Sequence, residues 1–100
     1  MIENILNIYH NAIRDHVDLL YRRGRTDRLI TWKVGSDEIH DPTLIAFRAY
    51  RDRSYADVVM VCAGTNRIGQ PLPKDIIFLP VARDLIAIKR RYLTYPHHQT

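Results

Sequence analysis

The side chains best suited to chemistry in this 100-residue chain are its five histidines and its one cysteine. A zinc site needs three or four such ligands held close together. His10 and His16 are six positions apart, so they do not share a helical face as residues four apart would. His97 and His98 fall in a stretch that we expect to fray, and Cys62 stands in an apolar run typical of a core. The sequence therefore predicts no metal site, no cofactor and no cysteine nucleophile.

Three acidic residues cluster in one short segment, at Asp37, Glu38 and Asp41. They lack the alternating ligand pattern of a calcium-binding loop, so we expect them to be solvated. The chain also has no glycine-rich phosphate loop and no Gly-x-Ser-x-Gly nucleophile elbow. These features predict a protein that is not an enzyme.

Basic side chains outnumber acidic ones, 15 to 11, which gives a formal net charge of +4. They form two groups that could meet phosphate or an acidic partner: Arg22, Arg23, Arg25 and Arg28, and further along Arg83, Lys89, Arg90 and Arg91. The simpler alternative is a solvated helix end, where cations complement the helix dipole. The apolar stretch at 55–63 is unlike a recognition helix, so we expect no sequence-specific nucleic-acid binding. A small basic protein that contacts phosphates nonspecifically stays open as a third class.

Neither a membrane span nor a secretory signal is visible in the sequence. The longest apolar runs, at 58–63 and 76–79, are far shorter than the roughly 20 residues of a membrane-spanning helix. The first residues lack the basic start and apolar region of a signal peptide. We therefore expect no membrane contact and folding in a reducing cytoplasm.

The elements that must position these residues follow from the spacing of apolar side chains. Apolar residues recur at intervals of three and four over residues 2–23, which predicts an amphipathic helix. The remaining segments predict strands at 29–34 and 75–79, helices at 43–50, 55–63 and 81–93, and a loop at 67–75. The predicted fold class is therefore α+β.

Two helix starts have recognisable chemistry. Asp41 precedes Pro42, a pairing typical of a capping side chain before the first helical residue. Ser54 stands three residues before Asp57, which approximates a capping box for the helix at 55–63.

The central segment, residues 29–80, resembles the LysM family. Four stretches carry the likeness: the strand LITWKVG at 29–35, TLIA at 43–46 followed by Tyr50 and Asp52, NRI at 66–68, and the closing LPKDIIFLP at 72–80. The resemblance implies a βααβ core, in which a two-stranded antiparallel sheet carries two short helices. The chain departs from the family pattern at Arg51 and Asp75, where glycine is usual.

Within this family, the stretch YRDRSY at 50–55 is more similar to the LysM-like tail and baseplate proteins of contractile-tailed bacteriophages. That likeness implies a structural virion protein, located in the tail or baseplate. It would act as an adhesive subunit that joins the tail tube or hub to the sheath or baseplate wedges, as a homo-oligomeric ring.

The alternative is a peptidoglycan-binding LysM module. In wall-binding members, two loops cradle N-acetylglucosamine through backbone amides, and they correspond here to 35–42 and 67–74. The first loop is enlarged and acidic, and the second contains Pro71 and Pro73, which have no amide hydrogen. These departures disfavour sugar binding.

The predicted organisation is an N-terminal amphipathic helix and linker at 1–28, a LysM-like domain at 29–80, and a C-terminal helix and tail at 81–100. The first helix carries more apolar positions than so small a domain is expected to cover, which favours a partner interface. The expected apolar anchors are Ile5, Leu6, Tyr9, Ile13 and Leu20, and the expected polar rim is Arg22, Arg23, Arg25, Lys89, Arg90 and Arg91. The alternative is that both terminal helices complete the protein's own core.

Overall fold

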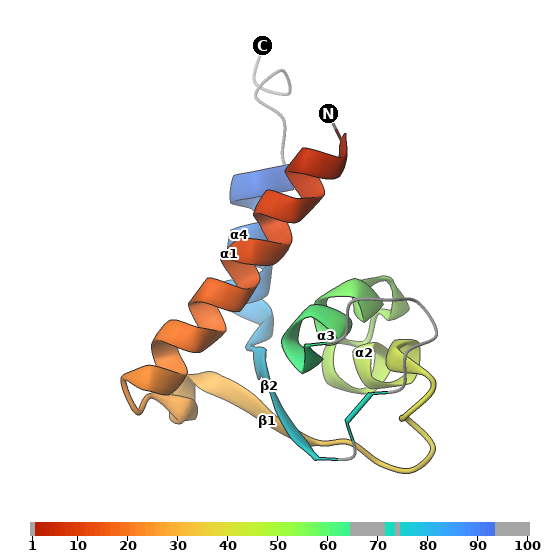
Figure 1. Ribbon diagram of the computed structural model, residues 1–100. Helices are drawn as coiled ribbons and strands as arrows, with labels where there is room; N and C mark the ends of the chain where they lie inside the picture. Colours follow the sequence, from red (N-terminus) through yellow and green to blue (C-terminus); the bar gives the residue numbers. More distant parts are fainter. Residues whose placement is uncertain (1, 65–71, 74, 94–100) are drawn as a thin grey trace.

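The structure is a computed structural model that describes residues 2–64, 72–73 and 75–93, with side chains from residue 6 onwards (Figure 1). Its elements are α1 (Ile2–Arg22), a 3-10 turn (Thr26–Arg28), β1 (Leu29–Lys33), α2 (Pro42–Tyr50), a second 3-10 turn (Arg53–Tyr55), α3 (Ala56–Ala63), β2 (Ile76–Pro80) and α4 (Ala82–Leu93). The α+β class and the βααβ order between flanking helices are as the sequence predicts. The expected tail and most of the expected loop at 67–75 lie outside the described residues.

The two strands form an antiparallel sheet in which Leu29 is opposite Pro80 and Lys33 is opposite Ile76. Ile77 and Leu79 are buried under the helices, because alternate side chains of a strand point to one face. Ile76 belongs to the opposite face and is exposed. The sheet therefore has one covered face and one open face.

One predicted helix start is confirmed and the other is wrong. The Asp41 carboxylate accepts a hydrogen bond from the Thr43 amide at 3.1 Å, which caps α2 as expected. The Ser54 side chain does not cap α3; it donates to the Asp52 carboxylate at 2.7 Å. Asp52 also accepts from the Ser54 amide and so organises the 3-10 turn before α3. A capping box needs the serine side chain to reach forward, and here the preceding aspartate has engaged it.

Two hydrophobic clusters share α3 between them. The first lies between the sheet, α2 and α3, and its buried members are Val34, Ile45, Ala46, Val59, Leu72, Ile77 and Leu79. The second joins α1, α3 and α4 through Tyr9, Ile13, Val58 and Leu85. Because Val58 and Val59 are neighbours on α3 and pack into different clusters, this short helix connects the βααβ core to the terminal helices.

Helix α1 is also tied to α3 by a hydrogen bond between His10 Nε2 and an Asp57 oxygen at 2.7 Å. His16 Nε2 lies 3.4 Å from an Asp84 oxygen on α4, but the two atoms are not hydrogen-bonded. Helices α1 and α4 run antiparallel, so the start of α1 lies beside the end of α4, away from the sheet (Figure 1). The terminal helices thus form a paired extension of the core and pack into it.

Candidate docking surface

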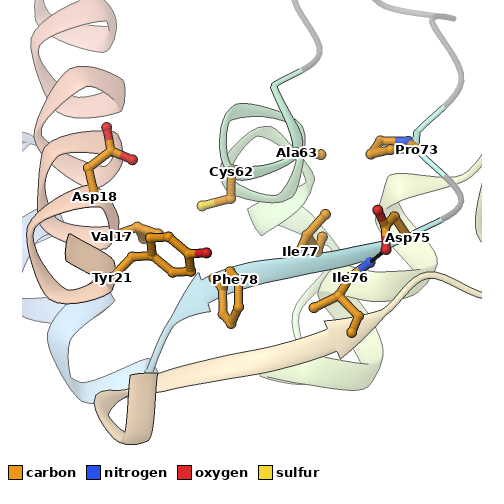
Figure 2. A pocket seen from close by; sticks show the side chains of 10 residues that line it. All are labelled: Val17, Asp18, Tyr21, Cys62, Ala63, Pro73, Asp75, Ile76, Ile77 and Phe78. Carbon is orange, nitrogen blue, oxygen red and sulfur yellow. Dashed lines mark hydrogen bonds between the residues drawn. The ribbon is translucent and has the colours of Figure 1, made fainter. Parts of the chain in front are cut away.

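A groove with a volume of about 340 Å³ lies between α1, α3 and β2 (Figure 2). We call it the α1–β2 groove. Val17 and Tyr21 of α1 form one wall, Cys62 of α3 lines it from above, and Phe78 of β2 lies below. These residues come from three distant parts of the sequence, so only the packing of α1 against α3 and β2 creates the groove.

Two carboxylates stand at the margins of this apolar groove. Asp18 lies on the α1 side, and Asp75 precedes β2 at the other end (Figure 2). Asp75 accepts a hydrogen bond from the Ile76 amide at 2.7 Å. Among the described residues, no cation lies within 4 Å of either carboxylate. The groove therefore combines apolar side chains with two carboxylates that form no ion pair within the described residues.

The groove continues onto the open face of the sheet. The Tyr21 ring packs against the Phe78 ring with centroids 5.2 Å apart, yet 57% of Tyr21 remains exposed. Ile76 is also exposed on this face. An aromatic and an aliphatic side chain left open beside a groove are typical of a protein-binding surface.

The loop between β1 and α2 is built on a buried glutamate, contrary to the expectation of a solvated acidic cluster. Glu38 is only 3% exposed and accepts hydrogen bonds from Trp32 Nε1 at 3.1 Å and the Gly35 amide at 2.8 Å. Arg48 pairs with Glu38 at 2.6 Å and with Asp37 at 2.9 Å. Burial alone would raise the pKa of Glu38, but the Gly35, Trp32 and Arg48 donors together hold it below its usual value.

The same loop is tied to the segment that precedes β2. The Leu72 amide donates to the Ile39 carbonyl at 2.8 Å, and Leu72 is buried in the first cluster. The Gly35 amide is already used by Glu38. Two backbone groups at the end of the fold where a wall-binding LysM module would hold sugar are therefore engaged within the chain.

The structure separates the predicted interface residues into buried and exposed sets. Tyr9 and Ile13 are buried in the second cluster, Ile13 completely, so they are not available as anchors for a partner. The expectation was wrong for these two because α3 and α4 cover the centre of the α1 apolar face. Leu6 is 38% exposed, Leu20 is half-buried, and the Ile5 side chain lies outside the described residues.

All six predicted rim cations are exposed: Arg22, Arg23, Arg25, Lys89, Arg90 and Arg91. They lie in two separate places. The first three lie at and just after the end of α1, where Arg25 pairs with Asp27 at 3.3 Å. The other three lie in the last part of α4, where Lys89 stands over the Tyr55 ring at 5.0 Å. They do not form one continuous rim.

Sequence reasoning missed the groove residues Val17, Phe78 and Ile76 and the exposed Ile8. Ile8 is 53% exposed on α1, outside the apolar stripe that faces the core. Its position off the stripe is a usable signal, because an apolar residue on the polar face of a helix is not needed for the core. The groove has no such signal, because its walls come from segments that are far apart in the sequence.

The described residues contain no group of three or more histidine, cysteine or acidic side chains that could hold a metal ion. Burial raises the pKa of the Cys62 thiol to about 12, so it remains protonated near neutral pH. No helix in the described part of the chain is both long and apolar enough to cross a membrane. The thiol in the wall of the groove is therefore not an activated nucleophile.

Comparison of the chain with protein-family models, with curated proteins and with solved structures gives no match.

Proposed function

We propose that this protein is a LysM-like structural subunit of a contractile phage tail, which joins other tail or baseplate proteins by adhesion and catalyses no reaction. The proposal combines the motif resemblance of residues 29–80 with the β1–α2–α3–β2 order of the central elements. In this proposal the central unit is the scaffold, and the surfaces that bind partners lie between it and the terminal helices.

The observation that carries the proposal is the α1–β2 groove. It is formed only where α1, an element outside the LysM-like segment, packs beside β2. The apolar side chains among its lining residues and the exposed Tyr21 and Ile76 offer the kind of surface that supplies most of the binding energy at protein interfaces. The addition of α1 thus gives the small core a binding surface that the core alone lacks.

The loop end of the molecule supports adhesion over sugar binding. The Gly35 amide and the Ile39 carbonyl already have partners within the chain, and the carboxylate of Glu38 is enclosed by three donors. A glycan that binds through backbone groups would have to displace these bonds, and each displaced buried group would cost about 1–3 kcal/mol.

The proposal is tested by asking where the protein resides and what it binds. We expect mass spectrometry of purified contractile particles from the source cells to detect the chain in a fixed ratio to the tail tube protein. We expect the purified protein to stay in the supernatant when peptidoglycan sacculi are sedimented, with a wall-binding LysM module as positive control. Absence from the particles would refute the proposal, and sedimentation with sacculi would favour the wall-binding alternative.

A further inference from the structure

We infer that the α1–β2 groove receives the opposite end of a second copy of this chain, so that copies join head to tail. The inference rests on the proposed role of the chain as an assembly subunit, and it names one partner and one contact. The opposite end, which we call the distal end, consists of Leu6 in the first turns of α1 and Arg90 and Arg91 at the end of α4. Figure 1 shows these two helix ends side by side, away from the sheet.

The charges of the groove and of the distal end indicate that the distal end of a second copy occupies the groove. The groove has Asp18 and Asp75 at its margins, and no lysine or arginine is among its lining residues. At the distal end Arg90 and Arg91 are exposed, and among the described residues no carboxylate lies within 4 Å of either guanidinium. Each end therefore carries the charge that the other lacks, and docking would pair exposed charges without burying an unmatched one.

An apolar side chain of the distal end is also complementary to the groove. Leu6 is 38% exposed, which leaves an aliphatic side chain open at the same end of the helix pair as the arginines. The groove, at about 340 Å³, is lined by apolar side chains such as Val17 and Phe78, and an aliphatic side chain of this size can enter it. An aliphatic anchor with arginines near it matches the arrangement of a typical interface, with an apolar core and a polar rim.

The positions of the two surfaces determine what kind of assembly follows. The groove lies beside the sheet and the distal end lies at the other end of the molecule, whose longest dimension is 47 Å. One copy can therefore use both surfaces at once. A contact between two different surfaces is heterologous, and it closes into a ring or continues as a filament according to the rotation between copies.

The test uses two complementary variants of the full chain and measures mass by sedimentation equilibrium over a concentration series. The groove variant carries Asp18→Arg and Asp75→Arg, and the distal variant carries Arg90→Asp and Arg91→Asp. All four positions are exposed, and circular dichroism checks that both variants fold. The wild type should exceed the mass of a dimer as concentration rises, and each variant alone should weaken association about tenfold or more.

Mixing the two variants gives the sharpest result. In an equimolar mixture the intact distal end of the groove variant meets the intact groove of the distal variant, and the two reversed surfaces also carry opposite charges, so association beyond a dimer should be restored. Added salt should weaken this assembly, because the paired charges are near the surface. Asp15→Arg and Arg83→Asp, which reverse exposed charges on the same two helices outside both surfaces, serve as matched controls and should leave the mass unchanged.

Several outcomes would overturn the inference. A wild type that stays monomeric at every concentration would do so, as would a distal variant that still dimerises alone, since that requires a different surface. If the control charge reversals weakened association between copies as much as the test variants do, the effect would come from the overall charge of the protein and the inference would be wrong. Leu6→Asp gives an independent check, because it changes the distal end without altering an arginine. A monomeric protein that is nevertheless present in contractile particles would overturn the inference and leave the proposed function standing.

Discussion

At the scale of single residues, Glu38 determines the shape of the loop between β1 and α2. It accepts hydrogen bonds from a side chain of β1, from the loop backbone and from Arg48 of α2. Removing its charge leaves these donors with a weaker acceptor. The sequence could not reveal this role, because the partners lie six and ten positions away and no local pattern connects them to the glutamate.

Glu38→Gln should lower the free energy of unfolding at pH 7 by about 2 kcal/mol, the usual contribution of hydrogen bonds to a charged group. The folded pKa of Glu38 lies below the ordinary value of about 4.3, so its stabilisation is present above that value and is lost as pH falls through the folded pKa. The difference between wild type and variant should therefore shrink between pH 5 and about pH 3 in urea titrations followed by circular dichroism. Asp15→Asn, at an exposed position on α1, is the control, and a difference independent of pH would contradict the assignment.

Arg51 ends α2 in a backbone conformation that glycine adopts more readily than arginine. The residue ends α2 in the left-handed conformation, with φ of 61°. This conformation costs a residue with a side chain roughly 1–2 kcal/mol, which glycine avoids. The end of α2 therefore contains a residue in an unfavourable conformation.

Arg51→Gly should raise the free energy of unfolding by about 0.5–1 kcal/mol, after subtracting the greater freedom of glycine in the unfolded chain. Gly64→Ala is the converse test, because Gly64 ends α3 with φ of 78° and an added Cβ would meet no atom within 4 Å. It should lower the free energy of unfolding by about 1 kcal/mol through backbone strain alone. Thermal melts of both variants measure these effects, and the same direction of change in both would argue against this explanation.

At the scale of elements, the sequence predicted most helices and strands because they have a clear hydrophobic period or a recognisable cap. Helix α3 is the exception, since its apolar run has no clear period and its expected cap does not form. The sequence did not predict what covers α1. The spacing of Tyr9 and Ile13 shows that one face of α1 is apolar, but the same spacing is found in helices that pack into a core and in helices that bind a partner. The burial of these residues against α3 and α4 is a property of the packed chain that no single segment encodes.

Two aspartate substitutions in α1 separate the covered part of its face from the open part. Ile13→Asp places a charge in a site with no exposed area and should destabilise the protein by about 4 kcal/mol or more, enough to unfold it. Leu6→Asp changes an exposed position and should alter stability by only about 0.5 kcal/mol. Thermal denaturation followed at 222 nm distinguishes them. A folded Ile13→Asp protein would mean that α1 is not part of the core.

At the scale of the whole molecule, α3 unites two regions that the sequence divides at residues 28 and 80. The motif resemblance marks residues 29–80 as a unit, yet Val58 of that unit packs with Tyr9 and Leu85 from the terminal helices. The candidate site is likewise formed by segments that are distant in the sequence. Its charges and aromatic rings can be read from the sequence, whereas the groove exists only because α1 crosses beside β2.

We therefore expect the protein to unfold in a single cooperative transition. The fluorescence of Trp32, which packs against the first cluster, reports on the βααβ core, and circular dichroism at 222 nm reports on all helices. Their urea midpoints should coincide because α3 belongs to both clusters. Separate midpoints, with helical signal lost before the tryptophan signal changes, would show that the terminal helices unfold independently.

The antiparallel pairing of α1 and α4 also determines how the protein would respond to mechanical load. Tension that pulls Ile2 and Leu93 apart acts at one end of the pair, so the helix contacts would separate one turn after another at low force. Tension applied between the groove and the distal end runs along the helices, and many side-chain contacts must then yield together. A head-to-tail assembly would load each copy in this second, stronger direction.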